Sequence, residues 1–462
     1  ITTGTPQLNV DFTVGGNMTI SGTGTLTVNA GKTLSVASGG TADLGGKSVT
    51  FKSDATGTAQ LGQVLGTLSN ASNVTMERYI PARRAYRFMA APATTTTSIK
   101  QNWMENGTNT AGLGTHITGT GGATNGFDVT ATNNPSLFSF NNTLQNWVAS
   151  TNTNATLAAG DAYRLMVRGD RGIDLTNNAA TPSVTVLRTT GSPYVGSKTY
   201  TLSSTTGDWN MIGNPYQSTV DGDLLKANFN NVTPYYYAWD PKMGTRGAYV
   251  AYDFVGGTNS LAGSQIDKYF QPGQSFFVQT DASGAASVQF AESMKASSAN
   301  QTSVFQPSVA YPTINATINY TDSLAKNAPA MDGFKLLFDN SFSNAVDKND
   351  AQKFYNLDEN IAISESGTLL SIDKRQMYDV NTEIKLSALN YVRQQYTMQF
   401  SWSNPVDNGL QAKLMDNYTN TSTPISFSGN TNYAFTVDNS IAASKASDRF
   451  KIVFVPNAAL PV

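Results

Sequence analysis

Residues 24–54 read GTLTVNAGKTLSVASGGTADLGGKSVTFKSD, and they suggest how the chain begins to fold. Short runs that alternate apolar and polar residues, such as Leu26 to Val28 and Leu34 to Val36, recur about every seven to eight residues between glycine-rich turns. Strands this short cannot each bury an apolar face alone, but a stack of them can. The pattern predicts β-solenoid-like rungs over residues 1–75, with an ordinary sheet of many tight turns as the alternative.

The remaining sequence also indicates strands. Charged residues make up only 13% of the 462 residues, so Thr, Ser, Asn and Gly supply most of the polarity, and these short side chains favour strands and turns over helices. We therefore predict an all-β protein in which the rungs are followed by two β-sandwich, jelly-roll-like domains. An aromatic-rich domain is expected over 76–300, and a second domain, with about eight strand-like segments, over 305–462. The unpatterned segment 292–308 is the predicted linker.

Composition argues against several functional classes. The net charge of −2 gives no general attraction to nucleic acid, even though residues 78–88 combine four arginines with aromatic side chains. No apolar run approaches the roughly 20 residues of a membrane-spanning helix. The chain has no cysteine, which excludes disulfides and thiolate metal sites. Low charge without cysteine fits an exported bacterial surface protein, so we expect an extracellular protein that neither binds nucleic acid nor spans a membrane.

The sequence shows no recognisable catalytic motif. His116 is the single histidine and lies in a Gly/Thr loop without a nucleophile motif, and the few glutamates are scattered. A histidine-based zinc site lacks ligands. We predict that the chain is not an enzyme and uses no cofactor, with calcium as the one candidate ion.

Three further segments are weaker candidates for a functional site, and each also has a simpler structural interpretation. Acidic and amide side chains gather at Asp339, Asp347, Asn349 and Asp350, which predicts a calcium site or, alternatively, a solvated polar loop. The aromatic residues of PYYYAWDP predict a site for a ligand such as a glycan, with Tyr236 and Trp239 as its candidate residues, whereas the same rings could fill a core. Alternation sends Tyr235 and Tyr237 to one side of a strand and Tyr236 to the other, so we expect at least one side to be exposed. Arg168-Gly169-Asp170 is interpreted as a turn.

Five segments together resemble the large surface proteins that Bacteroidota export through the type IX secretion system. They are VTMERYIPARRAYRFMAAP (74–92), DWNMIGNPYQSTVD (208–221), AWDPKMGTRGAYVAYD (238–253), YFQPGQSFFVQT (269–280) and DRFKIVFVPNAALPV (448–462). The resemblance implies the surface of a Gram-negative bacterium, with the translocon and its shuttle barrel protein as partners during export. It also implies O-glycosylation at Ser323, within Asp322-Ser323-Leu324.

The two ends and the function follow from the same resemblance. Ile1 is not a start residue, and an apolar stub ends at Val462, so we expect both ends to be cut, with a C-terminal sorting domain missing. The favoured function is an adhesin or surface-display protein, linked to gliding motility through the resemblance alone. The alternatives are a structural subunit that self-assembles into a surface filament or layer, and a carbohydrate-binding accessory region.

Overall fold

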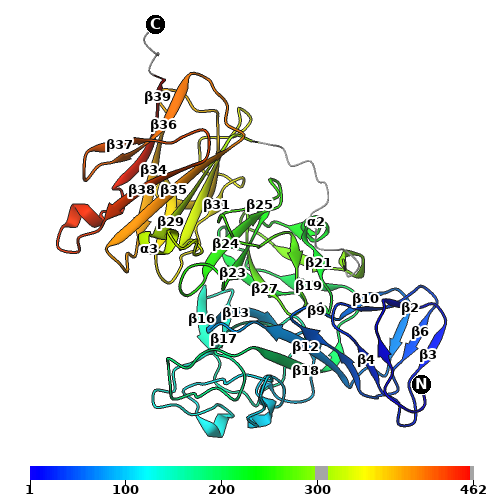
Figure 1. Ribbon diagram of the computed structural model, residues 1–462. Coiled ribbons are helices and arrows are strands. Elements are labelled where there is room, and N and C mark those ends of the chain that lie inside the picture. Colours follow the sequence, from blue (N-terminus) through cyan, green and yellow to red (C-terminus); the bar gives the residue numbers. More distant parts are fainter. Residues whose placement is uncertain (297–310, 458–462) are drawn as a thin grey trace. The chain divides into compact units, whose positions relative to one another are not determined.

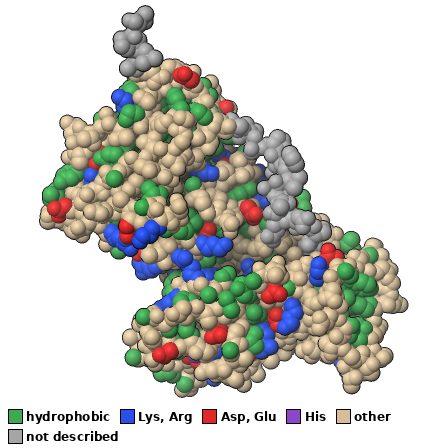
Figure 2. Space-filling view, viewed as in Figure 1, with side chains coloured by type: hydrophobic (Ala, Val, Ile, Leu, Met, Phe, Trp, Pro, Cys, Tyr) green, Lys and Arg blue, Asp and Glu red, His purple; other side chains and the backbone are tan. Residues whose placement is uncertain are grey.

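The computed structural model describes residues 1–296 and 311–457. With 43% of residues in strands and 6% in helices, it confirms the all-β prediction. Most of the predicted linker and the apolar stub before Val462 lie outside the described residues. No helix in the described part of the chain is long and apolar enough to cross a membrane. Most of the face seen in Figure 2 is free of charged side chains, as the composition predicts.

Two units divide the chain. One contains residues 1–232 and 268–304, and the other contains residues 233–267 and 305–462. The predicted rungs and most of the predicted middle domain therefore fall into one unit. The segment 233–267, which the sequence placed in the middle domain, groups with the C-terminal residues.

The N-terminal coils are a β-solenoid in which each coil contributes one strand to each of three parallel stacks (Figure 1). The predicted rungs are confirmed, and three of them form one coil. The first stack contains β1 (Gln7–Leu8), β4 (Leu26–Val28), β7 (Val49–Phe51) and β12 (Val74–Ile80); the second contains β2 (Phe12–Val14), β5 (Thr33–Val36) and β10 (Gln60–Val64); the third contains β3 (Asn17–Thr19), β6 (Thr41–Asp43) and β11 (Thr67–Ser69). A small hairpin, β8 (Ser53–Asp54) with β9 (Gly57–Thr58), enlarges the third coil.

Apolar side chains fill the interior of the coils because register places them in rows. Leu34 pairs with Leu61, and Val36 pairs with Val14 and Val64. Buried members of this core include Ile20, Leu26, Val28, Leu44, Val49, Phe51, Val74 and Met76. Burial of successive rows is the main stabilising contribution, since no coil has a core of its own.

A column of glycines forms one corner of the coils. Gly16, Gly40 and Gly66 each directly precede a strand of the third stack. Thr41 N donates to Gly16 O, and Thr67 N donates to Gly40 O. A Cβ on Gly40 would lie 2.2 Å from Val14 O, and one on Gly66 would lie 2.2 Å from Gly40 O. Only glycine fits where consecutive coils approach this closely.

The rest of this unit is a set of small sheets. β12 extends beyond the coils and pairs in antiparallel fashion with β18 (Thr185–Pro193), which also pairs with β14 (Ala93–Thr94). A four-stranded sheet has the order β13 (Ala85–Ala90), β17 (Ala162–Val167), β15 (Leu137–Asn141) and β16 (Asn146–Ala149). Shorter pairings involve β19 (Lys198–Thr201), β28 (Ser287–Phe290), β22 (Phe229–Asn230), β20 (Trp209–Gly213), β27 (Ser275–Gln279), β21 (Val220–Asp221) and β26 (Tyr269–Phe270). The two short α-helices are α1 (Ile99–Asn102) and α2 (Gly222–Lys226).

The second unit is built on one continuous sheet. Its order is β37 (Thr421–Pro424), β36 (Leu410–Asp416), β39 (Phe450–Pro456), β34 (Glu383–Leu389), β32 (Asn360–Glu365), β33 (Thr368–Arg375), β30 (Asp332–Phe338), β29 (Thr313–Tyr320), β35 (Gln395–Ser403) and β38 (Asn430–Thr436), with β31 (Ala351–Gln352) beside β33. The sheet folds over itself, because rings of strands distant in this order touch. The Phe435 and Phe450 centroids are 4.9 Å apart, and those of Phe338 and Phe454 are 5.8 Å apart. The resulting layers enclose one apolar core, as in a sandwich.

Segment 233–267 packs against the C-terminal strands within this unit. It contains β23 (Tyr235–Asp240), β24 (Ala248–Asp253) and β25 (Thr258–Asn259), and the short α3 (Thr321–Leu324) follows β29. The rings of Tyr249 and Phe354 stack at 4.1 Å, and Asp253 forms a buried ion pair of 2.6 Å with Lys374. Polar and apolar contacts together therefore join the hairpin to residues that lie more than 100 positions further along the chain.

Candidate functional site

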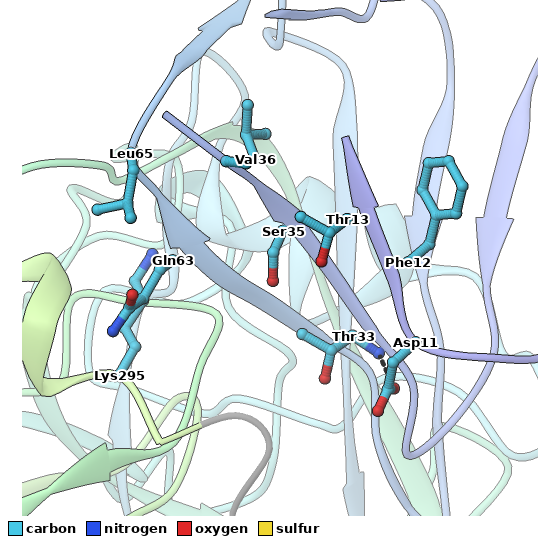
Figure 3. A pocket seen from close by; sticks show the side chains of 10 residues that line it. Asp11, Phe12, Thr13, Thr33, Ser35, Val36, Gln63, Leu65 and Lys295 are labelled. Atoms are coloured by element: carbon cyan, nitrogen blue, oxygen red, sulfur yellow. Dashed lines mark hydrogen bonds between the residues drawn. The ribbon is translucent and has the colours of Figure 1, made fainter. Parts of the chain in front are cut away.

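A groove of about 420 Å³ lies on the second stack of the solenoid (Figure 3). Thr13 on β2, Ser35 on β5 and Gln63 on β10 face it, one from each coil. They point outward because their neighbours Val14 and Val36 point into the core and side chains alternate along a strand. Stacking the coils thus places hydroxyl and amide groups in a row.

Two exposed apolar side chains border this row. Phe12 is 41% exposed and Leu65 is 58% exposed. Figure 3 shows the polar row between Leu65 on one side and Phe12 on the other. Polar groups flanked by apolar surface suit a ligand that has both hydroxyl groups and apolar faces.

Charged groups at the groove already have protein partners. Asp11 accepts a hydrogen bond of 2.9 Å from Thr33 N. Lys295, on the wall, pairs with Glu292 at 2.9 Å and donates to Gly62 O at 3.1 Å. Burial lowers the pKa of Lys295, and Glu292 opposes that effect. Apart from the second carboxylate oxygen of Asp11, which can still accept from a ligand hydroxyl, the groove therefore offers uncharged donors and acceptors, and these groups bind and orient hydroxyls without supplying a proton-transfer pair.

Sequence reasoning missed the groove because a row across coils exists only after the coils stack. The available signal was the glycine column. Aligning the coils on Gly16, Gly40 and Gly66 brings Thr13 and Gln63 into register, and Ser35 lies two residues from that position.

The predicted aromatic ligand site requires correction. Tyr236 is fully buried, and Trp239 is 6% exposed. The Tyr236 ring packs against Tyr252 and Phe254, with centroids 5.5 and 5.4 Å away. All six residues of β23 are buried, so alternation does not turn one aromatic face to solvent. These rings belong to a core, which was the alternative interpretation.

The structure does not gather the predicted calcium ligands into one coordination site. Asp339 accepts hydrogen bonds from Ser341, and Asp347 accepts one from Asn349 N. Asp350 accepts from the N–H groups of Asp347 and Lys374. Among the described residues, no group of three or more His, Cys, Asp or Glu side chains is placed to hold a metal ion. Calcium binding stays a prediction without geometric support.

Burial gives Asp350 another property. It raises the pKa of this carboxyl to about 7, although the two N–H donors act in the opposite direction. The nearby charges of Asp373 and Asp347 raise the pKa further. Asp350 therefore titrates near neutral pH instead of behaving as a permanently charged ligand.

His116 has a structural environment. Its Nδ1 lies 3.0 Å from Asp128, which Arg171 also binds through two hydrogen bonds of 2.8 and 2.9 Å. Burial alone would raise the pKa of Asp128, but the hydrogen bonds from His116 and Arg171 lower it to about 2. The three side chains tie loops of the N-terminal unit together.

The remaining two sequence motifs lie at partly exposed positions. Asp170 of the Arg-Gly-Asp triplet accepts hydrogen bonds from the N–H groups of Gly112 and Gly172, which fits the predicted turn. Ser323 lies in α3, partly exposed, with its hydroxyl 3.5 Å from Asp322. Its glycosylation stays a prediction.

Comparison with known proteins gives one family. A family model described as a domain of unknown function, DUF8693, matches residues 2–454. No curated protein and no solved structure matches the chain.

Proposed function

Since the chain belongs to the DUF8693 family, a domain of unknown function, we propose its role from its own structure: a non-enzymatic surface protein that binds neutral glycans along the solenoid groove. The main support is the row of Thr13, Ser35 and Gln63 between two exposed apolar side chains. A row with one polar group per coil matches a ligand that repeats its hydroxyl groups along a chain. In this role the protein is an adhesin, and its rigid coils hold the binding groups in place.

Location and route belong to the same proposal. Low charge, the absence of cysteine and the resemblance to type IX cargo support export to the surface of a Gram-negative bacterium. Capture of the chain from exporting cells should then recover translocon or shuttle components. If cells that do secrete the chain consistently fail to yield these components, the proposed route is contradicted. The proposal that the groove binds glycans is not affected by that result.

The groove is tested with an array of neutral oligosaccharides, followed by calorimetry on the best ligand. Ser35→Tyr places a ring in the middle of the groove and should weaken binding by at least about tenfold, since an interaction worth about 1.4 kcal/mol is lost. Thr27→Tyr is the matched control, because Thr27 is the middle residue of β4 and faces outward on another stack of the same coil. Equal effects of the two variants, or an array without any hit, contradict glycan binding in the groove.

Self-assembly is the second candidate function, supported by the first coil. β1, β2 and β3 are edge strands of their stacks, and Val10 beside them is 64% exposed. Unpaired edges can pair with another chain. At the other end of the coils β12 pairs with β18, and Leu61 N donates to Gln217 O. Among the described residues, contacts thus cover two of the three stacks at this end and leave only β11 as an edge strand, so the first coil is the more open end, which favours pairing of two copies over a continuous filament.

Light scattering over a range of concentrations tests self-assembly. The expected result is a dimer that Val10→Lys converts to monomer, because a buried unpaired lysine is unfavourable at an interface. A monomer at every concentration contradicts it, and so does a dimer that Val10→Lys leaves intact.

A further inference from the structure

A second pocket, of about 410 Å³, lies among loops of the N-terminal unit, away from the groove. Two arginines line it: Arg84, between β12 and β13, and Arg168, directly after β17. Its other polar lining residues include Thr130, Thr132, Asn134 and Thr176. The pocket wall contains no Asp or Glu among the described residues, so its charge is positive.

Arg168 has no anionic partner in the part of the chain that the structure describes. Its Nη1 is buried without a hydrogen-bond partner. Burial, and then the neighbouring charge of Arg84, lower the pKa of Arg168, and the charge of Asp128 opposes them without reversing the shift. Holding two guanidinium groups close together without a directly bound anion costs free energy, and a bound oxyanion would offset that cost.

The acidic residues around the pocket are already bound elsewhere. Each of the three has hydrogen-bond donors other than Arg84 and Arg168. The donors are Arg171 and His116 for Asp128, the N–H groups of Gly112 and Gly172 for Asp170, and Thr176 for Asp174. These carboxylates therefore do not substitute for a ligand.

Arg84 is oriented by one contact and keeps free donors. Its Nη1 donates to Asn178 O at 2.6 Å, and its Nη2 donates to Asn178 Oδ1 at 3.1 Å. A guanidinium has five N–H groups, so three remain for a ligand. Both arginines line this pocket and can thus offer N–H groups to one oxyanion.

We propose that this pocket binds the carboxylate or sulfate group of an acidic saccharide. Arg84 and Arg168 bind the oxyanion, and the threonine hydroxyls and Asn134 bind sugar hydroxyls. The volume of about 410 Å³ is in the range of small-molecule sites and exceeds the space that a single inorganic anion needs. The proposal concerns an anionic ligand in a separate pocket, so it does not depend on neutral glycans in the solenoid groove.

Calorimetry of the whole chain at low salt with sodium glucuronate, glucose 6-sulfate, glucose and sodium sulfate tests this assignment. At least one acidic sugar should bind, and glucose should bind at least about tenfold more weakly. Arg168→Gln should weaken that binding about 10- to 100-fold, because losing the free energy of one charge-assisted hydrogen bond changes the dissociation constant by about this factor. Lys226→Gln removes the same charge elsewhere in this unit and should leave binding unchanged.

Arg84→Gln is the second variant, since Arg84 is an exposed loop residue whose loss should not prevent folding. It should also weaken binding of the acidic sugar about tenfold or more. Three results overturn the proposal: equal binding of glucose and the acidic sugars, equal effects of Arg168→Gln and Lys226→Gln, or binding of inorganic sulfate as tight as that of the sugars. Ser35→Tyr should not change this binding, so failure here and failure of the groove are distinguishable.

Discussion

Arg449, which directly precedes β39, combines several interactions in one buried side chain. Its Nε lies 2.9 Å and its Nη2 2.6 Å from the two carboxylate oxygens of Asp416. Its Nη1 donates to the carbonyl groups of Thr436 and Ser444, and its guanidinium lies 4.9 Å from the ring centroid of Phe450. The guanidinium presents its N–H groups as a planar fork, and this geometry, not the charge alone, satisfies these acceptors.

Arg449→Lys should therefore lower the free energy of unfolding by about 3 kcal/mol, because an ammonium group leaves part of Asp416 and one or more carbonyls unsatisfied. Lys451→Gln, two residues further along the chain on β39, is the control. Lys451 is 31% exposed, and its partner Glu383 is 41% exposed, so this change should cost less than about 1 kcal/mol. Urea unfolding followed by circular dichroism compares the two. Similar losses for both contradict a special role of the fork.

Asp350 predicts a pH dependence of stability. Its pKa is about 7 in the folded chain and 3.8 for an ordinary aspartate, so the folded state holds the proton more tightly. The resulting stabilisation is complete below about pH 4 and is lost as the pH rises through about 7, with a total of at most about 4 kcal/mol. Asp350→Asn cannot titrate. The stability of this variant relative to the original chain should rise between pH 4.5 and 8.5, and a constant difference contradicts the prediction.

At the level of the coils, Gly40 and Gly66 of the glycine column should tolerate no side chain. A Cβ on Gly40 meets a backbone oxygen, Val14 O, at 2.2 Å, so the coils must separate locally. Gly40→Ala should cost about 2–3 kcal/mol or more. Gly15→Ala is the matched control, since no atom lies within 4 Å of its Cβ and its change should stay within about 1 kcal/mol. Equal unfolding midpoints of the two variants would show that the coils adjust freely.

Local sequence patterns predicted the coil strands but not how they assemble. Alternation and glycine turns are properties of adjacent residues, and they identified most of the short strands within residues 1–75. The number of strands per coil could not be inferred from the sequence, because the coils do not repeat at a fixed number of residues. Pairing partners are 20 residues apart for Gln7 and Thr27 but 25 apart for Thr50 and Thr75, partly because the β8–β9 hairpin enlarges one coil.

The aromatic strand β23 shows why the ligand prediction failed. Alternation predicts one exposed face only if solvent covers that side of a strand. Contacts with residues more than 100 positions away, such as Tyr235 OH with Asn349 O, leave no trace in the local pattern. Both faces of β23 are buried for this reason, and neither the site nor the grouping of 233–267 with the C-terminal unit could be inferred.

Across the whole molecule, the ion pair of Asp253 and Lys374 joins the hairpin to the C-terminal strands. Both side chains are at most 2% exposed. Lys374→Met leaves a buried carboxylate unpaired and should destabilise the second unit by about 3–5 kcal/mol. Hydrogen exchange should then lose protection over 235–253, while β4, β5 and β6 keep theirs, because the coils have a separate core.

The exposed pair of Arg393 and Asp322 provides the control for this experiment. Its side chains are 47% and 64% exposed, so Arg393→Gln should leave exchange almost unchanged. Loss of protection in the coils equal to that in the hairpin would contradict independent cores.

Residues 233–267 interrupt one unit and complete the other. A single cut in the chain can therefore release neither unit whole without part of the other. A gene fragment that ends between codons 267 and 305 encodes the hairpin without its partner strands, and it can also lack the closing strands of the first unit. Recombination moves continuous pieces of a gene, so neither unit can be inherited, duplicated or fused to other genes without part of the other.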